Sequence, residues 1–504
     1  MADLKLITAR TLKWNAIDRV ASQVLYAIVG IVLANILTKE EFGLIGALAI
    51  FQAFATIFVD SGFGAALLRE KNPSQTDYST VFWFNAAVSI AIYLILFFAS
   101  PLIAGLFHNQ QQLVPMSKVI FLTFVVNGLA IVQTNRLMKQ MDVRMIAIAN
   151  STSLLIAGAI GVTLAITGFG AWAMVWYTLS QATVKTTILW STGGWLPSLC
   201  FSTETLRRIR AVGFSVLLSS LLNTISLNIY NFVIGVWYSL RSLGIYTQAD
   251  KWSKMGTASI SQILTSSFVP LLSKVQDSRP DFHRYTDRAG RFTAFILLPA
   301  MTMLALMATP IFHLLFANKW DDAIILFQLL SARGIFIVLI SLYSNYLLAL
   351  GKAPRLFISE AIKDALILLA ILTTIRHRRI DLLILGQLAA SVITWLILLP
   401  VTSRGIQMPI RRILSHLTPF FLATITATLL TLLATILTHT ALPDAGLLHP
   451  HSPQQPPSLR IPYNILMLLI QTTGFIGTYL LTLRLLRVPE LSDALTYLLG
   501  RFRR

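Results

Sequence analysis

The chain has 504 residues, of which 55% are hydrophobic and only 12% are charged, and its formal net charge is +19. Soluble proteins usually carry about 25% charged residues, so this composition excludes an ordinary soluble protein. Apolar runs as long as the roughly 20 residues of a bilayer span recur along the chain and leave no room for a soluble domain. The sequence therefore predicts an all-α polytopic membrane protein, because helices satisfy their own backbone hydrogen bonds in lipid.

The apolar runs predict about fourteen transmembrane helices. The first run is too long for a signal-peptide core and lacks a small-residue cleavage site, so it is interpreted as the first span. The seventh and eighth runs are the least apolar. In chain order the predicted spans are residues 14–37, 42–66, 80–107, 113–135, 145–166, 169–190, 211–237, 245–272, 292–316, 322–350, 354–375, 380–402, 413–439 and 461–483.

Lysine and arginine residues are distributed unequally between the connectors of these spans. One alternate set, in which Lys185 is counted, holds 27 of them, and the other set holds 8. Because cytoplasmic connectors are enriched in basic residues, we expect both termini to lie in the cytoplasm. The basic outer connector at 376–379 is the exception to this pattern. The positive charge is interpreted as a topology signal, and no nucleic-acid partner is predicted.

A short repeat suggests that the chain contains two related halves. Phe42-Gly43-Leu44-Ile45 follows the first span, and Leu243-Gly244-Ile245-Tyr246 follows the seventh, 201 residues later. Six intervening spans preserve orientation, so a true repeat is parallel and related by an axis along the membrane normal. The alternative is chance similarity between two short turns. Between the halves, the mixed apolar and basic segment 195–210 is typical of an interfacial linker.

Sequence motifs of common enzymes are absent from the chain. There is no Walker A sequence, no Gly-x-Ser-x-Gly elbow and no His-Glu-x-x-His. Cys200 is the only cysteine, so an internal disulfide cannot form. We therefore predict no enzyme activity, no cofactor and no metal site.

Charged residues inside the spans are the first candidates for function. A charge at the bilayer centre costs about 2.5–3.5 kcal/mol on insertion scales, so such residues usually face a cavity or a partner. In the first span, Arg19 is available to phosphate, Gln23 lies one turn further, and Asp18 is a candidate for ion coupling. Asp60 in the second span is a second candidate for ion coupling. The alternatives are a headgroup position for Asp18 and Arg19 and a structural ion pair for Asp60.

The seventh span carries a polar face. Asn223, Tyr230 and Asn231 belong to a series of polar residues that recur about every three or four positions. Amides and hydroxyls at this depth can bond to sugar hydroxyls, and they can equally bond to neighbouring helices. We favour a cavity.

Three cations lie in later spans. Lys251 and Lys254 are one turn apart near the outer boundary of the eighth span, and Arg333 is the deepest cation. The alternatives are lysines that reach the membrane interface and an arginine paired with an acidic neighbour. Together with Arg19, these residues predict a cationic interior that attracts diphosphate, because desolvated charges interact strongly and arginine matches phosphate with two donors.

Several short segments, in their order and spacing, are typical of one group of transporters. They are Lys13–Arg19, Val32–Thr38, Phe42–Leu44, Val59–Leu67, Tyr78–Trp83, Gly168–Ala173, Leu243–Tyr246 and Pro270–Asp277. With them the chain resembles the Wzx-type polysaccharide flippases of the multidrug/oligosaccharidyl-lipid/polysaccharide (MOP) exporter superfamily, over roughly residues 8–370. Asn35 departs from the family, which often has arginine there.

The resemblance implies two six-helix lobes around a central cavity, with two additional C-terminal helices. The corresponding boundaries are an N-lobe at 1–195, a cytoplasmic linker at 196–210, a C-lobe at 211–403, and two helices with a cytoplasmic tail at 404–504. It also implies that undecaprenyl-diphosphate-linked oligosaccharide moves from the cytoplasmic to the periplasmic leaflet of a bacterial inner membrane by alternating access. A proton or sodium gradient would drive transport, and a polysaccharide polymerase is a candidate partner.

Two other functions compete with this interpretation. A multidrug exporter of the same fold would need an apolar or acidic cavity for cationic drugs, which the basic interior disfavours. A membrane-embedded polysaccharide polymerase or ligase would be expected to carry a sizeable outer loop with arginine and histidine, whereas the longest outer connector, 440–460, holds one arginine and three histidines.

Overall fold

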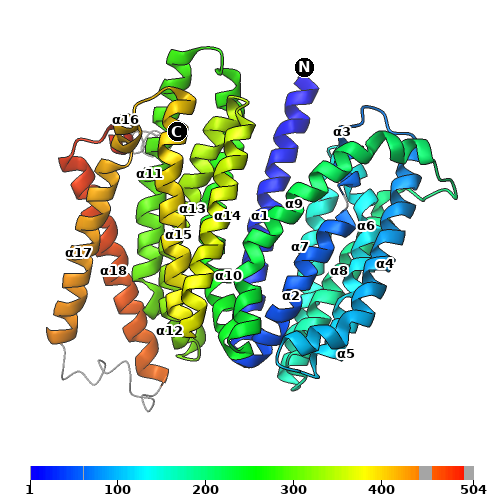
Figure 1. The fold of residues 1–504 in the computed structure, drawn as a ribbon. Coiled ribbons are helices and arrows are strands. Elements are labelled where there is room, and N and C mark those ends of the chain that lie inside the picture. The colour runs from blue at the N-terminus through cyan, green and yellow to red at the C-terminus, as the bar shows by residue number, and fades with distance from the viewer. Residues whose placement is uncertain (1, 61, 442–456, 493–504) are drawn as a thin grey trace. The chain divides into compact units, whose positions relative to one another are not determined.

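The computed structural model describes residues 2–60, 62–441 and 457–492, apart from the side chains of some helix residues, Asp60 among them. Helices make up nearly all of this described part, which contains no strand. The chain divides into two compact units, Met1–Thr247 and Gln248–Arg504, and within each the helices run roughly side by side (Figure 1). The helix α10 (Leu240–Lys274) contributes its first two turns to the first unit and the remainder to the second.

The first unit contains nine further helices. They are α1 (Ala2–Ile36), α2 (Lys39–Asp60), α3 (Phe63–Arg69), α4 (Gln75–Leu106), α5 (Leu113–Ile120), α6 (Leu122–Lys139), α7 (Val143–Ile166), α8 (Trp172–Gly193) and α9 (Thr203–Trp237).

Small residues allow the helices of this unit to pack closely. Gly158 of α7 lies against Val29 of α1, and Gly161 lies against Tyr177 of α8, so that a methyl group at either glycine would overlap its neighbour. In membrane proteins, where water drives little association between helices, such close van der Waals contact is a main source of packing energy. The helix α7 therefore joins α1 to α8.

The second predicted span is broken into two helices. The helix α2 ends at Asp60 and α3 begins at Phe63, with Gly62 between them in the left-handed conformation, φ 66°. Glycine adopts this conformation without the steric penalty of a Cβ atom. The expectation of one continuous helix over 42–66 is thus wrong, and the break aims the short helix α3 in a new direction.

The second unit contains the remaining helices. They are α11 (Arg279–Leu306), α12 (Ala308–Phe316), α13 (Asp321–Ala349), α14 (Ala353–Thr374), the 3₁₀ turn η1 (Ile375–His377), α15 (Ile380–Ile406), α16 (Ile410–Ser415), α17 (Thr418–Ala441) and α18 (Pro457–Leu485).

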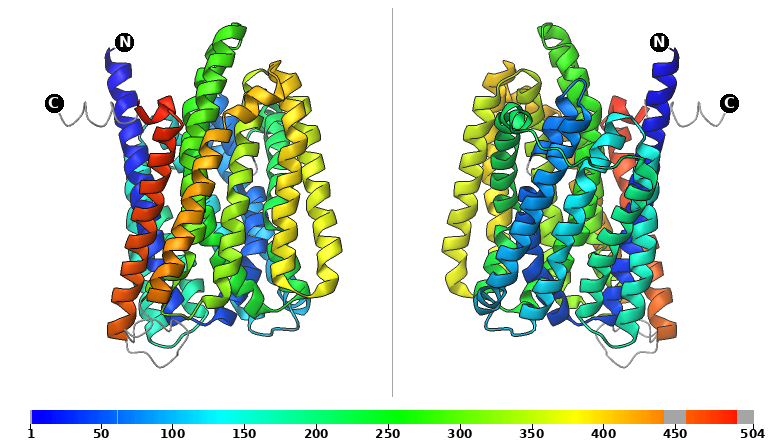
Figure 2. Two further views of the ribbon diagram at one scale, coloured as in Figure 1. Left: turned by 90° about the vertical axis from the view of Figure 1, so that its left-hand side faces the viewer. Right: turned by 90° about the vertical axis from the view of Figure 1, so that its right-hand side faces the viewer.

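The last two long helices, α17 and α18, pack side by side and against α11 (Figure 2). Their common core includes Phe420, Phe475 and Met301, and the Tyr479 hydroxyl donates a hydrogen bond of 2.9 Å to the Phe295 carbonyl. Beyond the end of α18, Glu490 pairs with Arg291 of α11. The C-terminal helices are thus integrated into the second unit.

Each predicted span coincides in most of its length with one helix or two consecutive helices, which bears out the all-α architecture. In the described part, ten helices are long and apolar enough to cross a membrane. This number does not confirm the predicted count of fourteen. The lobe boundaries inferred from the sequence stay predictions.

Candidate functional site

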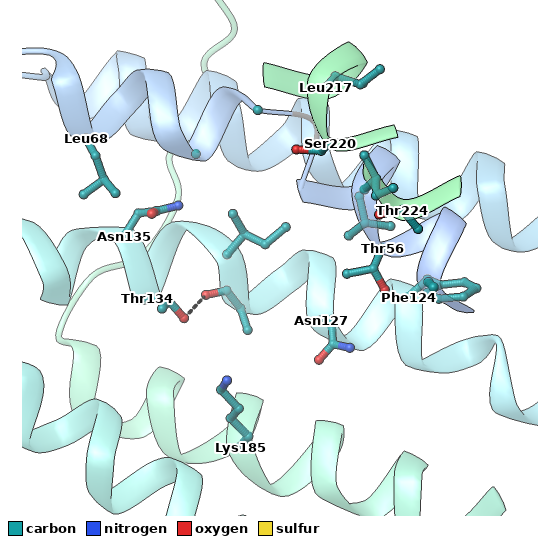
Figure 3. A pocket seen from close by; sticks show the side chains of 17 residues that line it. Thr56, Leu68, Phe124, Asn127, Thr134, Asn135, Lys185, Leu217, Ser220 and Thr224 are labelled. Atoms are coloured by element: carbon teal, nitrogen blue, oxygen red, sulfur yellow. Dashed lines mark hydrogen bonds between the residues drawn. The ribbon is translucent and has the colours of Figure 1, made fainter. Parts of the chain in front are cut away.

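A cavity of about 780 Å³ lies within the first unit (Figure 3). Helices α2, α3, α6, α8 and α9 supply its lining. The polar lining residues are Thr56, Asn127, Thr134, Asn135, Lys185, Ser220 and Thr224. Apolar side chains such as Leu68 and Phe124 complete a wall of mixed character, which is suited to a ligand with both polar and apolar parts.

The helix α6 lines the cavity with one continuous face. Asn127, Ile131, Thr134 and Asn135 are spaced by four, seven and eight residues from the first, which places them on the same side of a helix. The Thr134 hydroxyl donates to the Ala130 carbonyl within the helix at 3.0 Å. The two asparagine amides therefore supply the donors and acceptors of this face.

Lys185 is the one charged side chain among the described lining residues. It comes from α8, where it lies half-buried, and Figure 3 shows it reaching from α8 toward α6. The helix continues for eight residues beyond it to Gly193, or about 12 Å at 1.5 Å per residue. The charge distribution counted Lys185 among the basic residues of the cytoplasmic connectors, and the structure places it inside α8. Its position relative to the membrane stays a prediction.

The break between α2 and α3 shapes another part of the wall. Gly62 and Gly64 both line the cavity. A methyl group at Gly64 would overlap the Asn135 amide, so this glycine allows α3 to approach α6 and confines the Asn135 side chain. The segment Val59–Leu67, one of those that carry the family resemblance, thus contributes directly to the cavity.

The approach of α9 to the cavity is fixed by the linker that precedes it. Trp195 donates to the Gln75 side chain at 2.6 Å, and Trp83 donates to the Ser198 carbonyl at 3.0 Å. The buried Asp77 of α4 accepts hydrogen bonds from Thr205 at 2.7 Å and from Arg208 at 2.8 Å. These contacts hold the linker and the first turns of α9 against the start of α4.

The predicted residues of α1 lie outside the lining of this cavity. Arg19 is exposed and Gln23 is half-buried. Asp18 accepts hydrogen bonds from Ser22 at 3.1 Å and from Asn150 of α7 at 3.1 Å, so it joins two helices. The side chain of Asp60, the other candidate for ion coupling, is outside the described part of the structure.

The predicted residues of α9 are distributed around that helix. Asn223 is exposed and precedes the lining residue Thr224, whereas Tyr230 is buried, with 1% of its surface exposed. The Asn231 amide lies 3.4 Å from the Asn228 carboxamide oxygen, and its own side-chain oxygen is buried without a hydrogen-bond partner in the described structure. A role for these three residues in binding stays a prediction.

The three predicted cations of the later spans belong to the second unit. Lys254 forms an ion pair of 2.6 Å with the buried Asp250, and the Lys251 ammonium lies 5.1 Å from the centre of the Trp252 ring. The Arg333 guanidinium lies 3.4 Å from the Ser391 hydroxyl. Because α10 begins at Leu240, Lys251 and Lys254 are three to four turns inside the helix. Their proposed contact with diphosphate stays a prediction.

Most polar residues that line the cavity, Asn127, Asn135 and Lys185 among them, were not among the candidates predicted from the sequence. Asn127 and Asn135 are eight residues apart in a largely apolar run that also holds Gln133 and Thr134, and Lys185 lies within an apolar span. That spacing was a usable signal. It did not distinguish these residues from Gln133, whose side chain instead donates to the Trp195 carbonyl at 2.8 Å and holds the linker.

Comparison with known protein families shows to which family the chain belongs. The family described as "Polysaccharide biosynthesis protein" matches residues 32–325, which is more than half of the sequence. The chain belongs to this family. The match includes every helix that lines the cavity and confirms the resemblance drawn from the short segments.

Relatives of this polysaccharide biosynthesis protein are identical to it at about a quarter of the aligned positions. The teichuronic acid biosynthesis protein TuaB of Bacillus subtilis is 24% identical over 350 residues, which cover 68% of this chain and 72% of TuaB. The succinoglycan biosynthesis transport protein ExoT of Rhizobium meliloti is 23% identical, with 69% and 70% covered. The lipopolysaccharide biosynthesis protein WzxC of Escherichia coli is 24% identical, with 64% and 66% covered.

Solved structures establish the fold of this family member. The lipid II flippase MurJ in an inward closed conformation matches with a TM-score of 0.67 and 16% identity, covering 91% of this chain and 98% of MurJ. An inward-facing multidrug resistance MATE family transporter of the MOP superfamily matches with a TM-score of 0.56 and 14% identity, covering 76% and 96%. The predicted MOP-like fold is confirmed.

Proposed function

We propose that this protein is a flippase that moves undecaprenyl-diphosphate-linked oligosaccharide repeat units from the cytoplasmic to the periplasmic leaflet of the inner membrane. The transported units would serve surface polysaccharide biosynthesis. The observation that carries the proposal is a polar cavity of about 780 Å³, with one lysine in its described lining, in a member of the polysaccharide biosynthesis family. The names of the relatives, which include a transport protein for succinoglycan, support the same class of substrate.

The chemistry of the lining suits an oligosaccharide. A carboxamide both donates and accepts hydrogen bonds, as a sugar hydroxyl does, so Asn127 and Asn135 can each pair with such groups. The ammonium of Lys185 adds a point charge for an anionic group, which is a phosphate of the lipid carrier or an acidic sugar. The hydroxyls of Thr56, Ser220 and Thr224 provide further contacts on the helices opposite.

Transport would follow alternating access and use a proton or sodium gradient. Asp18 and Asp60 are the proposed coupling residues, and Arg19, Lys251, Lys254 and Arg333 are proposed to contact the diphosphate together with Gln23, Asn223, Tyr230 and Asn231. Both termini are proposed to lie in the cytoplasm. A polysaccharide polymerase would receive the translocated unit, and the protein itself would move its substrate without transforming it.

A multidrug exporter is the principal competitor, because MATE transporters share this fold. Such a protein would bind lipophilic cations, which an acidic cavity attracts and a basic one repels. The charged side chain in the described lining is a lysine. The electrostatics of the cavity therefore favour an anionic or neutral polar substrate.

Reconstitution in vesicles tests the proposal. A fluorescent undecaprenyl-diphosphate oligosaccharide is placed in the bilayer, and a membrane-impermeant lectin or glycosidase reports the fraction exposed on each side. We expect protein-dependent equilibration between leaflets, with the oligosaccharide unchanged in size. Polymerised product, or equilibration no faster than in protein-free vesicles under an imposed gradient, would contradict the proposal.

A further inference from the structure

A cluster of basic residues joins α14 to α15. It consists of Arg376, His377, Arg378 and Arg379, whose side chains are all exposed. These arginines are three of the eight lysine and arginine residues in the predicted outer connectors. Basic residues usually stay on the cytoplasmic side, so a concentration of them in an outer connector opposes the expected topology. The proposed transport function assigns them no role.

Only one of these arginines is paired within the described residues. The Arg379 guanidinium forms a two-point ion pair with the Asp381 carboxylate, with Nη2 2.5 Å from Oδ2 and Nε 3.3 Å from Oδ1. Arg376 and Arg378 form no ion pair in the described part of the chain. The connector therefore presents two guanidinium groups that are available to an external anion.

The turn holds Arg378 in a backbone conformation that favours glycine. Arg378 ends η1 with φ 50° and ψ 26°, and its amide donates to the Ile375 carbonyl at 3.2 Å. This left-handed conformation is unfavourable for a residue with a Cβ atom. The turn before α14 instead has a glycine, Gly351, at φ 67°. Unfavourable backbone geometry often occurs where a side chain has a function, and the charge of Arg378 is what a glycine would lack.

An apolar stripe on α14 leads to the connector. Leu368 and Leu372 are 49% and 71% exposed, and Arg376 follows them at the same interval of four residues. Side chains four residues apart lie on one face of a helix, and η1 continues the helical turn through Arg376. Ile367 and Ile371, one position earlier in each turn, are buried. The exposed leucines and the arginine therefore form one continuous surface with an apolar and a charged part.

The packing of α14 against α15 fixes the position of the connector. The two helices lie side by side (Figure 2), and Gly386 of α15 allows a close approach, since its ideal Cβ position is 3.2 Å from the Thr374 methyl group and 3.4 Å from the Ala370 Cβ atom. The predicted spans 354–375 and 380–402 end and begin beside the connector. The exposed guanidinium groups thus belong to a short, fixed turn at the expected level of the lipid phosphates.

We propose that an anionic phospholipid of the bilayer binds to this surface, which we name the lipid site and which is formed by residues 376–379, Leu368, Leu369 and Leu372. Arg376 and Arg378 hold the phosphate, because a guanidinium group donates paired hydrogen bonds that match phosphate oxygens. The acyl chains of the lipid lie along the leucines of α14. The site is separate from the polar cavity, which is lined by helices of the first unit.

The two-part character of the lipid site favours a phospholipid over a soluble anion. A free phosphate or an acidic saccharide contacts arginine but leaves the leucines of α14 without a ligand. A zwitterionic phospholipid matches the leucines but brings an ammonium group close to two positive charges. An anionic phospholipid satisfies both parts of the surface, as anionic headgroups do at other basic clusters beside membrane helices.

Lipid binding by the purified full-length protein tests the proposal. The protein in neutral detergent is titrated with phosphatidylglycerol or with phosphatidylcholine of the same acyl chains, and native mass spectrometry counts the bound lipids. A phosphatidylglycerol with a photoreactive acyl chain locates the contact. We expect phosphatidylglycerol to bind about tenfold more tightly than phosphatidylcholine and to cross-link to α14. Arg376→Gln with Arg378→Gln should remove most of this preference, whereas Arg376→Lys with Arg378→Lys should keep part of it.

A variant of the same connector separates recognition of the lipid from the loss of an arginine. Arg379→Gln with Asp381→Asn removes the ion pair but leaves the net charge of the connector unchanged. Phosphatidylglycerol should bind to this variant as it does to the native protein. Since the replaced arginines are exposed, all of these variants should keep the native melting temperature, which circular dichroism measures.

Variants of the apolar part test the contact with the acyl chains. Leu368→Ala with Leu372→Ala keeps every arginine and should weaken phosphatidylglycerol binding severalfold through the loss of apolar contact. Leu429→Ala with Leu433→Ala in α17 is the matched control, because these leucines are also four residues apart and are 61% and 51% exposed. The leucine variants test the lipid site even if the glutamine variant does not fold.

Three outcomes would overturn the proposal. Equal binding of phosphatidylglycerol by the native protein and the glutamine variant would show that the arginines are only solvated. Displacement of the lipid by inorganic diphosphate at similar concentration, with no effect of the leucine variants, would assign the site to a soluble anion. Stronger binding of undecaprenyl diphosphate than of phosphatidylglycerol would assign it to the transported carrier. None of these measurements depends on transport, so a failure of the flippase proposal would leave the lipid site in place.

Discussion

Replacement of Lys185 by glutamine removes the charge from the described lining of the cavity while keeping a polar side chain of similar length. The lysine lies half-buried on α8, where an ammonium attracts an anion more strongly than it would in bulk water. A hydrogen bond to a charged group contributes about 1.5–3 kcal/mol. Since about 1.4 kcal/mol corresponds to a factor of ten, Lys185→Gln should weaken apparent affinity for an anionic substrate by about 10- to 100-fold.

The assay is leaflet equilibration of lipid-linked oligosaccharide at graded substrate concentration. Lys185→Arg should retain most of the affinity, because it keeps the charge. Lys118→Gln is the matched control, since Lys118 is also half-buried in the first unit but lies over the Phe97 ring, 4.6 Å from its centre, outside the cavity lining. If Lys185→Gln and Lys118→Gln show the same concentration dependence as the native protein, the assignment of this cavity to the substrate is refuted.

Three further predictions concern stability and coupling. Asp77→Ala should lower the melting temperature in detergent by several degrees, because it removes hydrogen bonds of a buried carboxylate that contribute about 2–3 kcal/mol. Arg208→Ala should lower the melting temperature less, since the Arg208 side chain is 49% exposed. An equal fall in melting temperature for the two variants would contradict this account. Burial raises the pKa of the Glu490 carboxyl, but the hydrogen bonds from Arg291 lower it by more, so that this pKa lies below its usual 4.5. The ionised form of Glu490 therefore stabilises the fold at neutral pH. Thermal stability should therefore fall as the pH drops below about 4.5 through this lowered pKa, and a Glu490→Gln variant with the same pH profile as the native protein would exclude this ion pair as the cause. Asp18→Asn should keep the link to Asn150 and the melting temperature but lose acceleration by an imposed gradient, whereas unchanged acceleration would assign Asp18 a structural role alone.

The fold could be predicted because the length of an apolar run is set directly by the thickness of the bilayer. Each predicted span corresponds to helical structure, and the family resemblance placed the fold correctly. Local breaks are harder to predict, because a single left-handed residue such as Gly62 interrupts a run without changing its hydropathy. The sequence does contain two closely spaced glycines at that point, but glycine also occurs inside unbroken helices, as Gly158 does in α7.

The candidate site was less predictable, because a polar face on a helix has the same periodicity whether it meets a cavity or another helix. Asn135 lines the cavity, and Gln133, two residues earlier, is buried against the linker. Asp18 and Lys254 both have partners on their own or a neighbouring helix, whereas the alternatives considered for them were positions at the headgroups and at the membrane interface. What separates these residues is the packing of helices distant in sequence, which periodicity does not contain.

The charge of the substrate limits what the described cavity can do alone. A diphosphate carries negative charge on both of its phosphates, whereas the described lining offers the single ammonium of Lys185. Buried charge needs compensation, so further cations must approach the carrier during transport. Arg19, in the same unit as Lys185, is the candidate that this unit offers. Lys185→Gln should therefore weaken transport without abolishing it, and in combination with Arg19→Gln, which lies in the same unit, its effect on affinity should depart from the product of the two single effects if both residues bind the same diphosphate.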